Sequence, residues 1–291
     1  MKGVSRTCGV GRKRTVNKIQ RSRGRKTRAV IPLLFLFLLT ALIVRTAKDN
    51  LAGATGRDAS APTPTEASCV LSEGEDRGQA YIDGMIFVGE STTAHLRSRG
   101  VLTGGKKTAQ VWADDSNTMT LDLNILQKTI RYPETGEEMT IVQAAAEKRP
   151  TCMVISFGIN GLLAFAGRPA LYETSYVKLI EAIKAASPET TLLLQTVYPL
   201  GRAQHAFSED SATLNRYIDG LNRQLPDIAA KTGAYVVDTA TCLRDDEGYL
   251  RDEYQTDGIH LTSEAYEAIL HCLRTHGYPE AEQCWDGRQC A

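Results

Sequence analysis

Short apolar runs alternate with longer amphipathic segments through most of the chain. The runs are rich in branched and aromatic residues and end at glycine or polar turn residues, which is typical of buried strands. They cover residues 85–88, 110–113, 152–157, 191–197 and 234–238. Between these runs, apolar residues recur at the spacing of an amphipathic helix. That spacing predicts helices over residues 92–99, 140–148, 172–186, 214–228 and 262–276.

The alternation of strands and helices also predicts the architecture. Strands separated by helices of this length form a parallel sheet that is covered by helices on both faces. We therefore expect an α/β fold in which one three-layer α/β/α sandwich with a central parallel sheet occupies residues 80–279.

The first part of the chain has a different pattern, because a basic segment precedes an uncharged apolar run. Residues 1–28 hold eleven Lys or Arg and no Asp or Glu, and residues 29–44 carry no charge. With Arg45 snorkelling to the membrane surface, residues 29–47 reach the length of a membrane-spanning helix. The charge flank predicts a signal anchor over residues 29–47, with residues 1–28 in the cytoplasm and the body of the protein outside it.

A cleaved signal peptide is the alternative, with Ala52-Gly53-Ala54 as the cleavage site. The lengths of the basic and apolar segments favour the anchor, and both interpretations place the body outside the cytoplasm. Residues 48–79 are rich in small and polar residues and predict a flexible stalk. Residues 280–291 form a tail that contains two cysteines, Cys284 and Cys290.

Charge and cysteine content narrow the possible partners. The formal net charge is +0, but the chain after Arg28 holds 23 basic and 34 acidic residues. Such an acidic body argues against a nucleic-acid partner. Cys152 opens an apolar strand and is expected to be a buried thiol. Cys272 and His276 are four residues apart on one helix, but no second ligand pair supports a metal site.

Three polar motifs lie where a parallel sheet binds its ligands. Gly89-Glu90-Ser91 and Gly158-Ile159-Asn160-Gly161 each follow a predicted strand, and Asp257-Gly258-Ile259-His260 precedes the last helix. The carboxyl ends of parallel strands meet at one edge of the sheet, which is where ligands bind in such folds. The motifs are therefore expected to face one another.

Their residue types suit nucleophilic catalysis. A serine nucleophile needs a base, and histidine suits that task near neutral pH. Ser91 and His260 would take these roles, and Asp257 would hold the imidazole in the required tautomer. Asn160 would donate its amide N–H to the oxyanion of a tetrahedral intermediate, beside the N–H of Ser91.

Each motif also has a structural explanation. Ser91 could be a helix N-cap, and Asn160-Gly161 and Asp257-Gly258 are ordinary turn sequences. These explanations leave the joint occurrence of the motifs unexplained. The remaining histidines lack a carboxylate at comparable spacing and are expected to be structural or surface residues; they are His95, His205, His271 and His276.

The three motifs in this order resemble the SGNH/GDSL hydrolase superfamily, particularly its extracytoplasmic bacterial members. That family is named for a serine, a glycine, an asparagine and a histidine. Here Glu90 and Gly161 each replace a family aspartate, and residues 111–119 contain no glycine. Asn117 is the candidate replacement for the family glycine, because asparagine tolerates the left-handed conformation. The resemblance implies a flavodoxin-like fold and an oxyanion hole formed by Ser91, Asn160 and Asn117.

The resulting hypothesis is a membrane-anchored, extracytoplasmic serine esterase that needs no metal or organic cofactor. The resemblance implies an ester-bearing substrate, either an O-acyl or O-acetyl group on a glycan or a lipid ester. Two alternatives remain open. An O-acyltransferase would use the same residues, and a non-catalytic domain that binds a glycan or a protein partner would explain the altered motifs.

Overall fold

The computed structural model describes residues 69–116 and 118–279 of the 291-residue chain. Its main sheet has five parallel strands in the order β2-β1-β5-β6-β7. The strands are β1 (Met85–Gly89), β2 (Val111–Trp112), β5 (Cys152–Ser156), β6 (Thr191–Gln195) and β7 (Tyr235–Val237). This is the flavodoxin-like order, in which the chain reverses direction across the sheet at β1 and β5. The predicted α/β fold with a central parallel sheet is confirmed.

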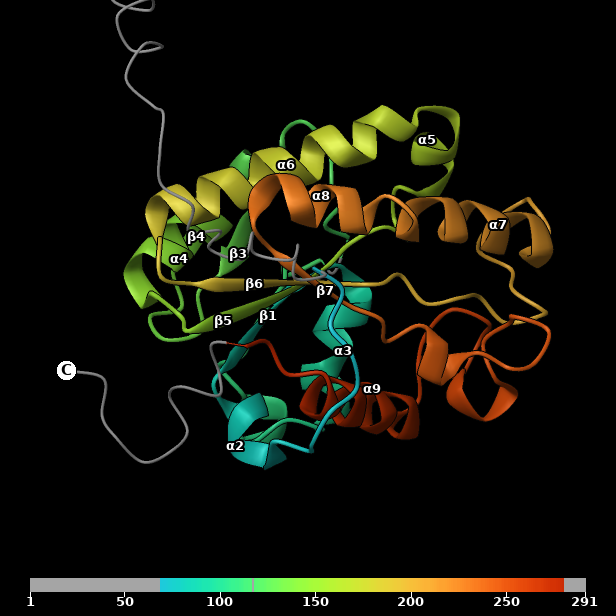
Figure 1. Cartoon of the computed structure of the whole chain (residues 1–291), viewed down its shortest axis with the longest axis horizontal. Helices are drawn as coiled ribbons and strands as arrows, with labels where there is room; N and C mark the ends of the chain where they lie inside the picture. The colour runs from blue at the N-terminus through green and yellow to red at the C-terminus, as the bar shows by residue number, and fades with distance from the viewer. Residues whose placement is uncertain (1–68, 117, 280–291) are drawn as a thin grey trace, which may run out of the picture. The chain divides into compact units, whose positions relative to one another are not determined.

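Helices cover both faces of the sheet (Figure 1). One face carries α4 (Ile141–Lys148), α5 (Leu162–Gly167), α6 (Pro169–Ala186), α7 (Ser211–Asn222) and α8 (Leu225–Thr232). The other face carries α2 (Gly78–Asp83), α3 (Ser91–Arg99) and α9 (Ser263–Thr275). Alternate residues of β1 enter the two cores, because Ile86 packs on the first side and Phe87 on the second. A strand buried on both faces reads as a continuous apolar run, which is why the sequence locates these strands well.

Side-chain caps explain where several helices begin. Thr140 accepts a hydrogen bond from the Gln143 N–H, and the Gln143 side chain accepts one from the Thr140 N–H. This reciprocal pair is a capping box that satisfies two otherwise unpaired donors at the start of α4. Asp210 and Thr262 cap α7 and α9 with one side-chain acceptor each, for the Thr213 N–H and the Ala265 N–H respectively.

Several element boundaries differ from the sequence expectation. The single helix predicted over residues 214–228 is two helices, α7 and α8. The break precedes Pro226, which lies in the first turn of α8, because a proline ring there clashes with the preceding helical turn. Helix α6 begins earlier than predicted, at Pro169. A short antiparallel hairpin of β3 (Thr129–Arg131) and β4 (Glu138–Thr140) had no counterpart in the prediction.

The predicted stalk requires a correction at its end. Val70 forms a parallel bridge with Val236 of β7, and the Leu71 N–H donates to the Val236 carbonyl at 2.9 Å. Leu71 is buried in the core beneath α9. Residues 69–79 therefore belong to the domain and not to a stalk, because the edge of β7 and the second core both use them.

Other N-terminal and C-terminal expectations lie outside the described residues, namely the basic segment 1–28, the anchor 29–47 and the tail 280–291. Within residues 69–116 and 118–279, no helix is long and apolar enough to cross a membrane. Cys152 is buried in β5, and burial raises the pKa of its thiol, so the expected buried thiol is confirmed.

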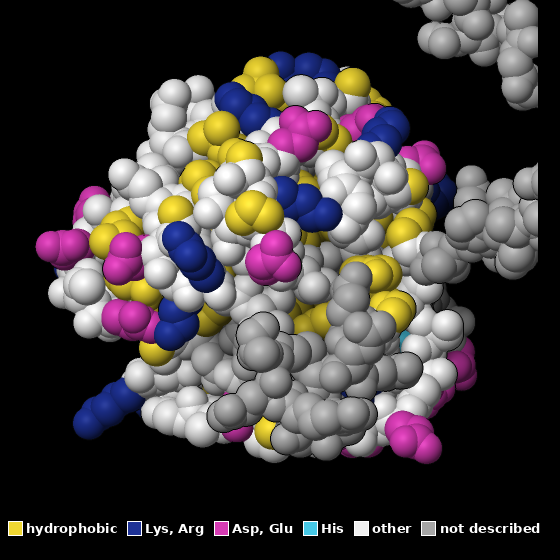
Figure 2. Space-filling model, turned by 60° about the vertical axis from the view of Figure 1, so that its left-hand side comes forward, with side chains coloured by type: hydrophobic (Ala, Val, Ile, Leu, Met, Phe, Trp, Pro, Cys, Tyr) yellow, Lys and Arg dark blue, Asp and Glu magenta, His cyan; other side chains and the backbone are white. Residues whose placement is uncertain are grey.

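The described surface mixes charges of both signs. Figure 2 shows Lys and Arg side chains interspersed with Asp and Glu and with small hydrophobic areas. The described residues visible on this face form no continuous basic stripe, which is the surface feature that follows a nucleic-acid backbone.

Candidate active site

Ser91 lies at the turn from β1 into α3, as the sequence predicts. Strand β1 ends at Gly89, and Glu90 has an extended conformation before the helix begins at Ser91. A side chain at residue 89 would place its Cβ 2.3 Å from the Ser156 carbonyl oxygen and 2.2 Å from Thr93 Oγ1. Glycine is therefore required for the first turn of α3 to approach β5 this closely. The half-buried Ser91 is held where the free N–H groups of the helix point outward.

Glu90 joins this turn to the loop that follows β5. The residue is 2 % exposed, and its two carboxylate oxygens accept the N–H of Ile159 at 2.8 Å and of Asn160 at 3.0 Å. Burial raises the pKa of Glu90 to about 7, although the backbone N–H groups of Asn160, Ile159 and Gly158 act to lower it. Glu90 thus fixes the backbone of the Gly158–Gly161 motif.

The strand register brings the loop that carries Asn160 next to the serine turn. Gly89 pairs with Ser156 in the parallel β1–β5 ladder, so the residues that follow both strands emerge next to each other. The Asn160 side-chain amide donates to the Met119 carbonyl oxygen at 2.8 Å. An asparagine amide has two N–H donors, so a second hydrogen remains for another acceptor. This arrangement suits the expected oxyanion role without using up the amide.

The segment expected to replace the family glycine is described only in part. Asn117, the candidate in that segment, lies outside the described residues. Asp114, which precedes it, binds the residues that follow it. The Asp114 carboxylate accepts the N–H of Thr118 at 3.2 Å and of Met119 at 3.0 Å. Those two backbone donors are therefore already engaged.

Asp257 and His260 form a hydrogen-bonded pair within one turn. The His260 Nδ1 and Asp257 Oδ2 atoms are 2.7 Å apart, and Asp257 Oδ1 accepts the N–H of His260 at 2.8 Å and of Ile259 at 3.1 Å. Gly258 makes the turn possible, since it has a φ of +85° and a Cβ there would lie 2.1 Å from the Ala203 carbonyl oxygen.

The charge state of this pair follows from the same contacts. Partial burial raises the pKa of Asp257, but hydrogen bonds from the His260 ring and from two backbone N–H groups outweigh it and leave the pKa below its ordinary value. The carboxylate is therefore ionised at neutral pH. An ionised Asp257 favours the hydrogen on Nδ1 of His260, which leaves Nε2 as the basic nitrogen.

Two contacts hold the His260 turn against the serine helix. The rings of His260 and His95 are in tilted contact, with centroids 4.9 Å apart and an interplanar angle of 52°. His95 is one helical turn after Ser91 and lies on the same side of α3. The Tyr266 hydroxyl of α9 donates to the Thr92 carbonyl oxygen at 2.6 Å. The structure thus brings the predicted residues of the serine and histidine motifs to one edge of the sheet.

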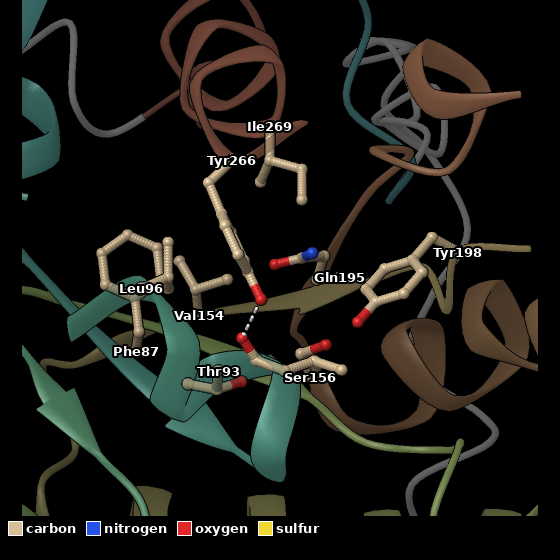
Figure 3. A pocket seen from close by; sticks show the side chains of 10 residues that line it. Phe87, Thr93, Leu96, Val154, Ser156, Gln195, Tyr198, Tyr266 and Ile269 are labelled. Atoms are coloured by element: carbon tan, nitrogen blue, oxygen red, sulfur yellow. Dashed lines mark hydrogen bonds between the residues drawn. The ribbon is translucent and has the colours of Figure 1, made fainter. Parts of the chain in front are cut away.

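A small cavity lies beneath the first turn of α3 (Figure 3). Its lining includes Thr93, Ser156, Gln195, Tyr198 and Tyr266, and its volume is about 10 Å³. Because this is about the space of one water molecule, the cavity belongs to the packing of α3 on the sheet and is not a substrate site. Figure 3 also shows Tyr266 reaching from α9 toward α3.

Sequence reasoning missed two contributors to this edge. The sequence pattern predicts Tyr266 as an ordinary core residue of an amphipathic helix. No neighbouring residue indicates its hydrogen bond to Thr92. His95 was expected to be structural or at the surface, although its spacing of four residues from Ser91 is a signal that places both on one helix face. Among the described residues, no group of three or more His, Cys, Asp or Glu side chains could hold a metal ion.

The fold and this site together define a class, a doubly wound α/β protein with a serine at the carboxyl edge of its first strand. Comparison with known families specifies it further. The model of the GDSL-like lipase/acylhydrolase family matches residues 87–268, which is more than half of the chain. The chain belongs to this family and is a hydrolase that acts on ester bonds.

Solved structures with a similar fold are distant in sequence. A GDSL-like lipase from Bacteroides thetaiotaomicron is 16% identical with a TM-score of 0.45, and the match covers 67% of this chain and 88% of that one. A candidate SGNH hydrolase from Slackia heliotrinireducens is 22% identical with a TM-score of 0.45, covering 66% and 98%. A carbohydrate esterase family 3 protein from Talaromyces cellulolyticus is 13% identical with a TM-score of 0.44, covering 70% and 99%. No curated protein sequence matches.

Proposed function

We propose that this hydrolase is a serine esterase in which Ser91, His260 and Asp257 form the catalytic triad. The observation that carries the proposal is the 2.7 Å contact between His260 Nδ1 and Asp257 Oδ2 in a turn that lies against the serine helix. The contact supports the tautomer in which Nδ1 carries the hydrogen and Nε2 is free to accept a proton. The serine hydroxyl, a weak nucleophile at neutral pH, becomes reactive when such a base lies beside it.

In the proposed reaction, Ser91 Oγ attacks the carbonyl carbon of the ester while His260 Nε2 takes the hydroxyl proton. The N–H of Ser91 and the side-chain amide of Asn160 donate to the oxyanion that forms, and Asn117 is proposed as a third contributor. His260 then gives its proton to the departing alcohol. Water, deprotonated by His260, attacks the acyl-enzyme and releases the acid. Asp257 supports the imidazolium in both steps.

The proposed substrate is an acyl ester, either an O-acyl or O-acetyl group on a glycan or an ester of a lipid. Family membership supports this class, because the family model describes lipases and acylhydrolases. The only chemical requirement that the triad sets is an accessible ester carbonyl, so the alcohol is to be identified by its release.

We also propose that the domain is tethered outside the cytoplasm by residues 29–47. The support is the sequence alone, in which eleven basic residues precede an uncharged apolar run. Protease added to intact cells should remove the domain and leave a small basic fragment in the membrane. Recovery of the whole domain in the medium, cut after residue 54 or close to it, would instead favour a cleaved signal peptide.

The triad is tested with a fluorophosphonate probe, which labels activated serines. The wild-type protein should be labelled and should hydrolyse p-nitrophenyl acetate, and Ser91→Ala should lose both activities. Ser208→Ala is the matched control, because Ser208 is an exposed serine in a loop and should keep both. Labelling that persists in Ser91→Ala would remove Ser91 as the nucleophile. A folded wild-type protein with neither activity would favour a binding domain on this fold.

A further inference from the structure

His95 is a titratable residue at the site that the proposed mechanism does not use. It lies on α3 one turn after Ser91, and its ring is in tilted contact with that of His260, with centroids 4.9 Å apart. Its Nδ1 atom is buried and has no hydrogen-bond partner among the described residues. A buried polar atom usually has a partner, so this histidine occupies its position at some cost in free energy.

We propose that His95 is a positioning residue, a neutral ring that holds the His260 imidazole toward Ser91. This inference rests on the proposed triad. It concerns how His260 is oriented and not which atoms react, since His95 is assigned no proton transfer.

The contacts of His260 show why it needs such support. Its side chain is 35% exposed, and its ring is held on one edge by the bond from Nδ1 to Asp257. One hydrogen bond leaves the ring free to pivot about that contact toward solvent. The His95 ring blocks one face of this movement, and because α3 also carries Ser91, the blocking surface and the nucleophile share one rigid element.

The surroundings of His95 also keep it uncharged. Burial lowers the pKa of His95, and repulsion from Arg99 and from His260 in its protonated form lowers it further, while Asp257 acts in the opposite direction. Arg99 lies on α3, and His260 and Asp257 lie in the turn before α9. A protonated His95 would place a second positive charge against His260 at the moment when His260 takes the serine proton. A neutral ring can support the imidazolium instead.

Two substitutions in the full-length protein separate positioning from packing. His95→Ala removes the ring, and kcat for p-nitrophenyl acetate should fall about 10- to 100-fold with KM nearly unchanged, the size of effect that misplacement of a catalytic group produces. His95→Phe keeps a flat ring of similar size and should recover most of kcat. His271→Ala is the control, because His271 is an exposed histidine of α9 and should leave kcat unchanged.

Two results would overturn the proposal. If His95→Ala keeps the wild-type kcat, the ring does not position His260. If His95→Phe is as impaired as His95→Ala, the imidazole chemistry of His95 matters and a positioning role is wrong. A loss of folded protein is recognised by thermal unfolding, and kcat is then referred to the folded fraction.

A measurement without substrate distinguishes this inference from the triad itself. Nitrogen NMR of the histidine side chains reports the tautomer and environment of the His260 ring. In His95→Ala the His260 signals should shift and broaden, whereas in His271→Ala they should not. If the wild type cleaves no ester, the triad proposal fails and this spectrum still decides the ring contact. Unchanged His260 signals in His95→Ala would refute positioning in either case.

Discussion

Two carboxylates border the serine turn, and their surroundings are opposite. Glu90 is 2 % exposed, and its carboxylate accepts the backbone N–H groups of Ile159 and Asn160. The Asp257 side chain is 53% exposed and faces the His260 ring. Burial raises the pKa of Glu90 to about 7, whereas hydrogen bonds that outweigh partial burial lower the pKa of Asp257.

The difference shows that position in the sequence motif does not fix the role of a carboxylate. Glu90 is adjacent to the serine in the chain, but its oxygens are occupied by the neighbouring loop. Asp257 is far from the serine in sequence, but it is the carboxylate that contacts the imidazole. Carboxylates whose environments move their pKa values apart commonly have separate tasks. We expect Asp257 to affect catalysis and Glu90 to affect the shape and stability of the site.

Substitution of Asp257 should have the largest effect. Asp257→Asn keeps the size of the side chain but removes the charge and favours the wrong tautomer of His260. We expect kcat to fall by about 10³- to 10⁴-fold, as in triads that lose their carboxylate, with little change in thermal stability. Steady-state hydrolysis of p-nitrophenyl acetate measures kcat, and Asp252→Asn, an exposed aspartate of the preceding turn, is the control. If kcat falls less than tenfold in Asp257→Asn, Asp257 does not have the catalytic role that separates it from Glu90.

Substitution of Asn160 should have the next largest effect. This residue has both a structural contact, through its backbone, and a proposed catalytic contact, through its side chain. Glu90 holds its backbone N–H, and its side-chain amide, which donates one hydrogen to Met119, has a second hydrogen for the proposed bond to the oxyanion. Asn160→Ala should lower kcat by about 10²- to 10³-fold with little change in KM, the effect of losing one oxyanion donor. Asn160→Asp should be at least as damaging, because a carboxylate would repel the oxyanion.

The control for Asn160 is Asn124→Ala, which changes an exposed asparagine elsewhere. If Asn160 were only a turn residue that donates to Met119, Asn160→Ala would lower the melting temperature and leave kcat of the folded fraction intact. That result would remove the Gly158–Gly161 motif from the mechanism.

Substitution of Glu90 should change the pH dependence of the free energy of unfolding more than it changes kcat. Its pKa of about 7 in the native state is above the ordinary 4.5, so the native protein binds this proton more tightly than the unfolded chain does. The stabilisation is complete below the ordinary pKa and is lost as the pH rises through 7. The full change amounts to about 3 kcal/mol. Glu90→Gln cannot titrate and should lack this loss.

Chemical unfolding at about pH 4 and about pH 8 provides the measurement. The free energy of unfolding of the wild type relative to Glu90→Gln should decrease by about 3 kcal/mol between these pH values. Glu189→Gln, at an exposed glutamate, should follow the wild type at both. Parallel profiles for the wild type and Glu90→Gln would show that Glu90 is not the buried titrating group.

Much of the fold and part of the site were predictable from the sequence. Five strands, their parallel arrangement and the serine turn were predictable, because strands buried on both faces appear as apolar runs that end at glycine. The Asp257–His260 pair was predictable as well, since a spacing of three residues in a glycine turn is local information. The split between α7 and α8 was missed, because apolar periodicity continues across the break before Pro226.

The contacts that assemble the edge were beyond sequence reasoning. The Glu90 bonds to Ile159 and Asn160 join residues that are 69 and 70 positions apart, and the Tyr266 bond to Thr92 spans 174. Such pairs follow from sheet register and helix packing, which periodicity does not specify. The stalk boundary was misplaced for a related reason, since a short segment of small and polar residues gives no sign that Val70 will bridge to β7.

Tyr266 provides the smallest and most discriminating prediction. Its hydroxyl joins α9 to the first turn of α3, and thereby the helix after the Asp257 turn to the helix after Glu90. Tyr266→Phe removes this one bond and keeps the ring in the core. The free energy of unfolding should fall by about 1–2 kcal/mol, the usual effect of losing a buried hydrogen bond, and kcat should change by less than about threefold. Tyr217→Phe, at a half-buried tyrosine of α7, should change neither quantity measurably. A large loss of kcat in Tyr266→Phe at normal stability would contradict the expectation that this bond affects stability and not catalysis. It would mean that the position of α9, and not only the local Asp257–His260 turn, sets the orientation of the imidazole.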